Sequence, residues 1–148
     1  MAATHQKILV WVFCVEREKA SFLLLKTTAK RGGFWQPVTG SVEAGEEPLA
    51  AAGREMREET GLEPLRIEPV SRPYEFEGRR GERVMEYPFL AEVLAGSRER
   101  IVMDRREHVE FQWVSGEQAL ERIKYPSNAR VLRDVLEQLS GQNRKERK

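Results

Sequence analysis

The sequence lacks the features of a disulfide-rich, membrane-spanning or strongly basic protein. Its single cysteine, Cys14, excludes an internal disulfide and a cysteine-based zinc site, and its apolar surroundings indicate a buried thiol. With 25 basic and 24 acidic side chains, the net charge is +1, so no overall basic field favours nucleic acid as a partner. No apolar run is long enough to span a membrane, and no signal peptide is recognisable. We therefore expect a cytoplasmic protein that does not bind membranes.

The length of 148 residues fits one domain with a single substantial core. We expect this domain to cover residues 1–142, followed by a charged, disordered tail over residues 143–148. A monomer or a homodimer is expected.

Apolar patterning predicts an α/β fold with mixed strands. Strands are predicted over residues 8–14, 22–25, 65–70, 74–77, 84–93 and 111–114, and a short strand or loop over 34–39. The strand at 84–93 is expected to break around Pro88, and residues 78–81 to form a hairpin turn. Helices are predicted at 48–60, at 116–123, and in a final segment that Ser127 caps and that ends before Gly141.

Residues 40–62 combine a glycine-containing loop with an acidic helix. Pro48 suits the first turn of a helix, because its missing N–H costs nothing there. Gly61 suits the left-handed residue just past the helix end. The segment therefore predicts a loop, a helix and a second loop.

Three glutamates of this helix, Glu55, Glu58 and Glu59, have i, i+3, i+4 spacing and share one face. Their mutual repulsion requires a compensating cation, and hard divalent ions such as Mg²⁺ prefer oxygen ligands. A lone acidic cluster is usually a solvated helix face. Here the complete spacing and the upstream glycine loop favour a metal site.

The pattern of this segment is glycine (Gly40), five residues, glutamate (Glu46), seven residues, then Arg-Glu-apolar-x-Glu-Glu-x-Gly-apolar. It resembles the Nudix box of the Nudix hydrolases at every fixed position and in both gaps. The resemblance implies an α/β/α sandwich with a mixed sheet, against which the box forms a catalytic loop–helix–loop. It also implies Mg²⁺-assisted cleavage of a diphosphate linked to another moiety, with Mn²⁺ as a substitute ion.

The resemblance also implies roles for the box residues. Glu55 and Glu59 match the metal-binding positions, one helical turn apart. Glu58 projects from the same face and either binds a further ion or polarises bound water. Gly40 either brings its backbone carbonyl near a metal or is a simple turn glycine.

Two further box residues, Glu46 and Arg54, match positions that pair to brace the loop against the helix. A plain surface ion pair is worth at most about 1 kcal/mol, so their value is expected to be positional.

Outside the box, Glu107 resembles the distant glutamate that supplies a metal ligand or the catalytic base in many Nudix enzymes; the alternative is an exposed surface residue. His108 is a general base, a structural histidine or a neighbour of the substrate. Trp113 is expected to anchor its strand in the core.

Residues 34–46, 107–113 and 125–130 resemble dihydroneopterin triphosphate pyrophosphatases within this family. This likeness implies a nucleoside triphosphate or dihydroneopterin triphosphate as substrate, with a monophosphate and pyrophosphate as products. Dinucleoside polyphosphates (Ap4A type) and ADP-ribose or nucleotide sugars stay open as alternatives, because Tyr74 and Pro73 are compatible with them. A nucleotide-sensing module without catalysis is the remaining alternative, although such modules usually lose box carboxylates.

Four residues are candidates for substrate contacts. Lys26 ends a predicted strand and either holds a phosphate or is solvated. Trp35 either stacks on a base or pterin or packs its own loop. Thr39 and Ser127 are candidates for hydrogen bonds to the substrate.

Overall fold

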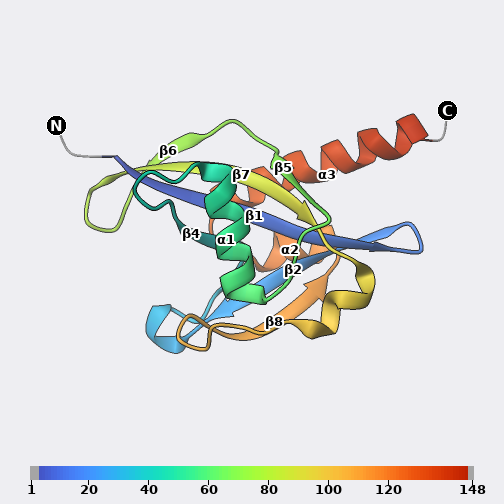
Figure 1. Ribbon diagram of the computed structural model, residues 1–148, viewed down its shortest axis with the longest axis horizontal. Coiled ribbons are helices and arrows are strands. Elements are labelled where there is room, and N and C mark those ends of the chain that lie inside the picture. Colours follow the sequence, from blue (N-terminus) through green and yellow to red (C-terminus); the bar gives the residue numbers. More distant parts are fainter. Residues whose placement is uncertain (1–3, 147–148) are drawn as a thin grey trace.

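The computed structural model describes residues 4–146 and contains a mixed β-sheet between helices (Figure 1). The central strand β1 (His5–Glu16) pairs in parallel with β7 (Arg83–Glu92), and antiparallel with β2 (Lys19–Thr27) and β4 (Val38–Ser41). The remaining strands are β3 (Trp35–Gln36), β5 (Arg66–Pro69), β6 (Tyr74–Glu77) and β8 (His108–Val114). Each predicted strand is therefore present, and β1, β2 and β8 are longer than expected.

Both faces of β1 are buried, because successive side chains of a strand point to opposite faces. Ile8 and Val10 belong to a core shared with α1 (Pro48–Thr60), whereas Leu9 belongs to a second core. The second core is shared with α2 (Gly116–Arg122) and α3 (Pro126–Glu146). The sheet thus has α1 on one face and α2 and α3 on the other, which confirms the α/β/α arrangement (Figure 1).

The predicted ends of α1 are confirmed. Pro48 is the first helical residue, and Gly61 follows the last one with a φ of 73°. The Gly61 N–H donates to the carbonyl of Arg57 at 2.8 Å, which caps the C-terminus. Of the described helices, none is both long and apolar enough to cross a membrane.

The break expected at Pro88 is wrong, because β7 runs without interruption through this residue. Strand β5 pairs with residues 89–92 of β7 and β6 with residues 83–86, so Pro88 lies opposite the interval between them. Its carbonyl accepts a bond from Val70 N–H on that side. In a strand the N–H and C=O of one residue face the same neighbouring strand, so the missing N–H of Pro88 is on the side of the interval between β5 and β6. Its absence interrupts neither the β5–β7 pairing nor the β6–β7 pairing.

Helix α3 differs from its prediction at both ends. It begins at Pro126, so Ser127 lies in its first turn rather than before it. Gly141 has no positive φ, and the helix continues through it to Glu146. A glycine inside a helix costs only about 1 kcal/mol relative to alanine. The expected tail therefore starts inside α3, and residues 147–148 lie outside the described residues.

The sheet divides where β2 leaves β1. Only residues 19–22 of β2 pair with β1, whereas residues 22–27 pair with β8. The first half of β1 pairs instead with β4. Helix α1 packs over this region and against β4, so its C-terminal half faces both β4 and the start of β8 (Figure 1). This division positions the site described next.

Candidate active site

Arg54 connects the loop before α1 to the helix and to β4. Its Nε and Nη2 donate to the two carboxylate oxygens of Glu46 at 2.9 and 3.0 Å. Nη1 donates to Glu55 at 2.9 Å and to Glu58 at 3.2 Å, and Nη2 also donates to the Ser41 carbonyl at 2.9 Å. The bond from Arg54 holds the pKa of Glu46 below its usual value. The pairing expected between Glu46 and Arg54 is therefore present, and it orients two neighbouring carboxylates.

Gly40 permits Glu55 to lie directly against β4. A Cβ atom at this position would overlap the Glu55 carboxyl group. Gly40 does not have a positive φ, so the requirement for glycine here is close approach rather than backbone conformation.

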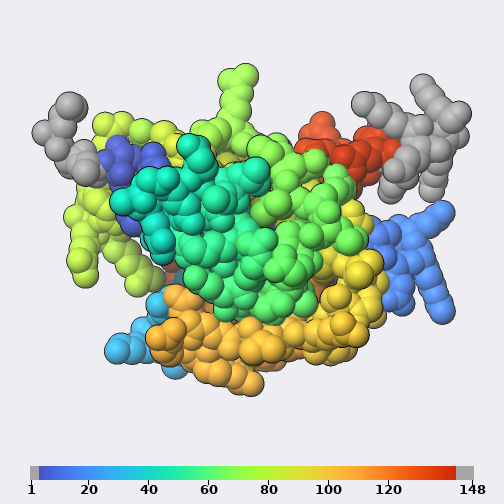
Figure 2. All heavy atoms as spheres, viewed as in Figure 1, coloured from blue at the N-terminus to red at the C-terminus, as the bar shows by residue number. Residues whose placement is uncertain are grey.

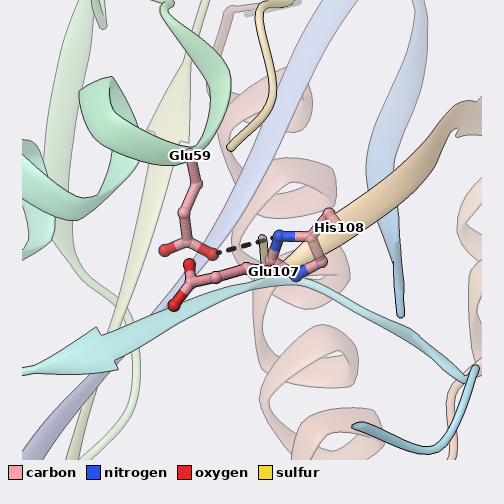
Figure 3. Close-up of side chains that lie close together, drawn as sticks. All are labelled: Glu59, Glu107 and His108. Carbon is pink, nitrogen blue, oxygen red and sulfur yellow. Dashed lines mark ion pairs between the residues drawn. The ribbon is translucent and has the colours of Figure 1, made fainter. Parts of the chain in front are cut away.

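Two chain segments bring a cluster of three side chains together (Figure 3). Glu59 comes from the last turn of α1, His108 is the first residue of β8, and Glu107 ends the turn just before that strand. One ligand atom from each of the three lies within 4.8 Å of the others. The Nδ1 atom of His108 is 3.7 Å from Glu59 Oε1. Glu107 also forms an ion pair with Arg31 at 3.4 Å.

The Glu59 carboxylate is in an unfavourable environment without a cation. It is 1% exposed, and burial, followed by the neighbouring Glu55 carboxylate, raises its pKa well above the usual value. Among the described residues, its Oε2 is one of three fully enclosed side-chain atoms without a hydrogen-bond partner. A buried carboxylate is tolerated when it is paired or coordinates a metal.

His108 is neutral at physiological pH, because burial, followed by the positive charge of Arg31, lowers its pKa to about 4. Its Nε2 lies 2.9 Å from the amide nitrogen of Gln36 and accepts a bond from it. The proton of the neutral ring is then on Nδ1, which faces Glu59. Nδ1 is a second of the enclosed atoms without a partner.

These residues fit a hard divalent cation. The enclosed, unpartnered oxygen of Glu59 adjoins two further carboxylates, Glu55 and Glu107. All three supply the oxygen ligands that Mg²⁺ and Mn²⁺ prefer. Glu58 is more exposed than these residues and is held by Arg54, outside the group formed by Glu59, Glu107 and His108.

A cleft of about 1000 Å³ adjoins this cluster on the α3 side of the sheet. Arg31 and Gln36 line it, and they also contact Glu107 and His108. Its far wall is the β6–β7 hairpin, which projects at the same end of the molecule as the segment after β2 (Figure 2). The lining carries cationic groups from Lys7, Arg79 and Arg80.

The four candidates for substrate contacts divide between two places. Thr39 and Ser127 line the cleft. Lys26 and Trp35 do not line it: they are paired across β2 and β3, with the Lys26 ammonium 5.9 Å from the Trp35 ring centroid. Trp35 also packs against the core shared with α3.

Sequence reasoning missed two residues of this region. Gln36, which contacts His108, lies within a block that resembles a known family, but nothing in its pattern marks it as a neighbour of His108. Glu86 is a buried acid in the cleft, and its position among the apolar residues of β7 was the available signal. Trp113 is a packing residue, as expected, and its indole donates to the Arg98 carbonyl.

Comparisons with known proteins agree with this geometry. Over 112 residues the chain is 39% identical to an octanoyltransferase of Myxococcus xanthus, a match that covers 72% of this chain but only 30% of that protein. It is 34% identical to an RNA pyrophosphohydrolase of Halorhodospira halophila, covering 76% of this chain and 71% of the relative. It is 27% identical to a dihydroneopterin triphosphate diphosphatase of Haemophilus influenzae, in a match that covers 89% of this chain and 87% of the relative.

Among solved structures, an Ap4A hydrolase of C. elegans superimposes with a TM-score of 0.80 at 22% identity, covering 93% of this chain and 99% of that one. At this identity the likeness shows the fold alone. The model of the NUDIX domain matches residues 5–135, which is most of the chain. The protein therefore belongs to the Nudix hydrolases, and its relatives include enzymes that act on pyrophosphate bonds.

Proposed function

We propose that this enzyme hydrolyses a nucleoside triphosphate, or the analogous dihydroneopterin triphosphate, to the monophosphate and pyrophosphate. The observation that carries the proposal is the convergence of Glu59 and Glu107 beside a cleft that carries cationic side chains. The carboxylates suit a divalent cation, and the cationic side chains suit the charge of a polyphosphate. The similarity to a dihydroneopterin triphosphate diphosphatase supports the choice of a triphosphate.

In this proposal Glu55, Glu59 and Glu107 hold the cation, and Gly40, whose backbone packs directly against the Glu55 side chain, contributes its carbonyl. A divalent cation supplies positive charge, which offsets the repulsion between a polyphosphate and these carboxylates and makes water a stronger nucleophile. Arg54 fixes Glu55 and Glu58 on the helix, so their geometry is set before the substrate arrives.

The remaining chemistry is assigned to side chains of this chain. A glutamate of the site removes the proton from water as it attacks phosphorus; the candidates for this base are Glu59 and Glu107 of the cluster and Glu58 beside it. His108 is neutral and enclosed, and its Nδ1 proton faces Glu59, which suits a residue that orients this carboxylate. Arg31, at the cleft wall, is placed to bind phosphate and to balance the charge of Glu107.

A dinucleoside polyphosphate is the second candidate substrate, and the size of the cleft favours it. At about 1000 Å³ the cleft is at the upper end of the range for small-molecule sites and has space for more than one nucleoside. Experiments must therefore separate these two substrate classes.

We expect a panel of substrates to show the highest kcat/KM for a triphosphate, with pyrophosphate rather than phosphate released. The panel should contain GTP, ATP, dihydroneopterin triphosphate, Ap4A, ADP-ribose and an RNA oligonucleotide with a 5′-triphosphate. Phosphate and pyrophosphate are measured separately, with and without Mg²⁺. Efficient cleavage of Ap4A or ADP-ribose by an enzyme that ignores every triphosphate would refute the triphosphate proposal.

Replacing Glu107 tests the part of the proposal that lies outside the box. Glu107→Gln should lower kcat by roughly 10- to 100-fold and change KM less, because the lost charge acts where charge develops in the transition state. Glu110→Gln is the matched control, since Glu110 is an exposed glutamate on β8, shortly after Glu107. Wild-type kcat for Glu107→Gln at every Mg²⁺ concentration would remove Glu107 from the metal site.

A further inference from the structure

Glu86 is a buried acid in the cleft, separate from the carboxylates of α1. It lies on β7 and is 4% exposed. It shares a face of the strand with Leu90, which belongs to the core packed against α3, so it is on the opposite face of the sheet from α1. Burying a carboxylate is unfavourable unless partners compensate it. A purely structural position on β7 would be filled at lower cost by an apolar residue.

Tyr74 orients this carboxylate from the neighbouring strand. Residues 74 and 86 are paired across β6 and β7, and the Tyr74 hydroxyl donates to Glu86 Oε1. Burial, followed by the charge of Glu86, raises the pKa of Tyr74, so the phenol keeps its proton and acts as the donor. Burial raises the pKa of Glu86, whereas the bond from Tyr74 and the charge of Lys7 oppose that change. These contacts favour a carboxylate that accepts hydrogen bonds.

The second oxygen of Glu86 is available to a ligand. Among the described residues, only Tyr74 donates a side-chain hydrogen bond to Glu86, and that bond uses Oε1. Oε2 has no such bond and is not fully enclosed, and Glu86 lines the cleft. The carboxylate therefore presents acceptor capacity to the cleft.

The surrounding wall suits a flat ring. Phe34 and Tyr125 pack edge to face at 5.4 Å between ring centroids, and both line the cleft. Phe76 lines the side formed by the β6–β7 hairpin. Phe76 and Tyr125 are 39% and 38% exposed. Exposed aromatic rings provide stacking surfaces for nucleobases and similar heterocycles. Of these rings, Phe76 lies next to Tyr74, with 6.4 Å between the ring centroids, so a heterocycle stacked on Phe76 would lie close to the carboxylate that Tyr74 contacts.

A carboxylate distinguishes heterocycles by the donors on their edges. Guanine offers a ring N–H beside an exocyclic amine, and a pterin ring offers the same pair of donors. Adenine offers an amine beside an unprotonated ring nitrogen, which repels a carboxylate oxygen. Hydrogen bonds to an ionised acceptor are stronger than those between neutral groups. A site that hydrogen-bonds one ligand strongly rejects an analogue that leaves its buried polar group without a partner.

We propose that Glu86 determines base specificity: its carboxylate, oriented by Tyr74, accepts bonds from the two adjacent N–H donors of a 2-amino-4-oxo heterocycle such as guanine or pterin. The inference rests on the proposed function, in which the substrate is the triphosphate of such a ring. It narrows that function, because it selects GTP-like and pterin substrates over ATP.

The test compares guanine and adenine ligands in two independent ways. The ratio of kcat/KM for GTP to that for ATP reports specificity in turnover. The ratio of Kd for AMP to that for GMP, measured by calorimetry in EDTA, reports recognition without metal or catalysis. In the wild-type enzyme both ratios should favour guanine by roughly 10- to 100-fold, the discrimination expected from one good bidentate contact.

Glu86→Gln should bring both ratios to near one or reverse them, because a carboxamide offers one acceptor and one donor, which matches the adenine edge. Tyr74→Phe should reduce both ratios without reversing them, since the carboxylate remains but loses its orienting donor. Glu75→Gln is the matched control: Glu75 lies beside Tyr74 on β6, pairs with Arg83 and is outside the cleft lining, so it should keep both ratios. Thermal melting verifies that each variant is folded.

Unchanged ratios in Glu86→Gln, or a wild-type enzyme without preference for GMP over AMP, would overturn the inference. An enzyme that cleaves no triphosphate but binds GMP in a Glu86-dependent manner would refute the proposed function and retain the role of Glu86. Triphosphate cleavage with equal rates for GTP and ATP would refute the role of Glu86 alone.

Discussion

Glu59→Gln should lower kcat by roughly 10²–10³-fold and leave the fold intact. The substitution keeps the volume of the side chain and removes one negative charge. Glu59 is enclosed, and its Oε2 has no protein partner, so a bound cation supplies the partner that this oxygen lacks. The measurement is steady-state turnover at saturating Mg²⁺, with circular dichroism to verify folding. Glu55→Gln should behave in the same way.

The control for this experiment is Glu63→Gln. Glu63 follows the same helix and pairs with Arg57 at 2.7 Å on the surface, away from the cluster. It should retain wild-type turnover, because an exposed pair contributes little. Comparable Mg²⁺-dependent turnover of Glu59→Gln and the wild-type enzyme would show that Glu59 is not a metal ligand.

In EDTA, the same Glu59→Gln substitution should stabilise the protein by on the order of 1–2 kcal/mol at neutral pH. Without a cation, burial and the adjacent Glu55 carboxylate disfavour the charged form of Glu59. Glutamine fills the same space without that charge. Urea denaturation of both proteins in EDTA gives the difference in the free energy of unfolding.

The sign of the pH dependence follows from the raised pKa of Glu59. Between its unfolded value near 4.5 and its higher folded value, the folded state binds more protons than the unfolded state. The wild-type protein therefore loses stability relative to Glu59→Gln as pH rises through this window. His108 acts in the opposite direction, since its folded pKa of about 4 lies below 6.5, so its own contribution to stability rises with pH between these two values.

A stability difference that stays constant from pH 5 to pH 8, or a less stable Glu59→Gln protein in EDTA, would contradict the strained environment assigned to Glu59. Addition of Mg²⁺ should then favour the wild-type protein, because a ligand stabilises the state that binds it. The substitution thus separates the effect of the Glu59 carboxylate on stability without a cation from its role in catalysis.

The sequence predicted the parts of the fold that depend on local pattern. Pro48 and Gly61 mark the ends of α1 because helix ends have specific backbone requirements. The i, i+3, i+4 spacing placed Glu55, Glu58 and Glu59 on one face because helical periodicity is fixed. The Glu46–Arg54 contact followed from the motif.

The parts that failed depend on which segments become neighbours. Pro88 is accommodated because two separate edge strands leave an interval opposite it, and no local pattern reports that pairing. Gln36 meets His108 only because β2 leaves β1 and pairs with β8. Glu86 is recognisable as a cleft residue only after β6 has been placed beside β7.

The most direct test of the central claim is product analysis of GTP hydrolysis by the wild-type enzyme and Glu59→Gln, each with Mg²⁺ and with EDTA. We expect GMP and pyrophosphate in equal amounts from the wild-type enzyme with Mg²⁺, and at most residual turnover in the other three reactions. Release of phosphate and GDP, full turnover in EDTA, or an unimpaired Glu59→Gln enzyme would contradict a metal-dependent triphosphate pyrophosphohydrolase centred on Glu59.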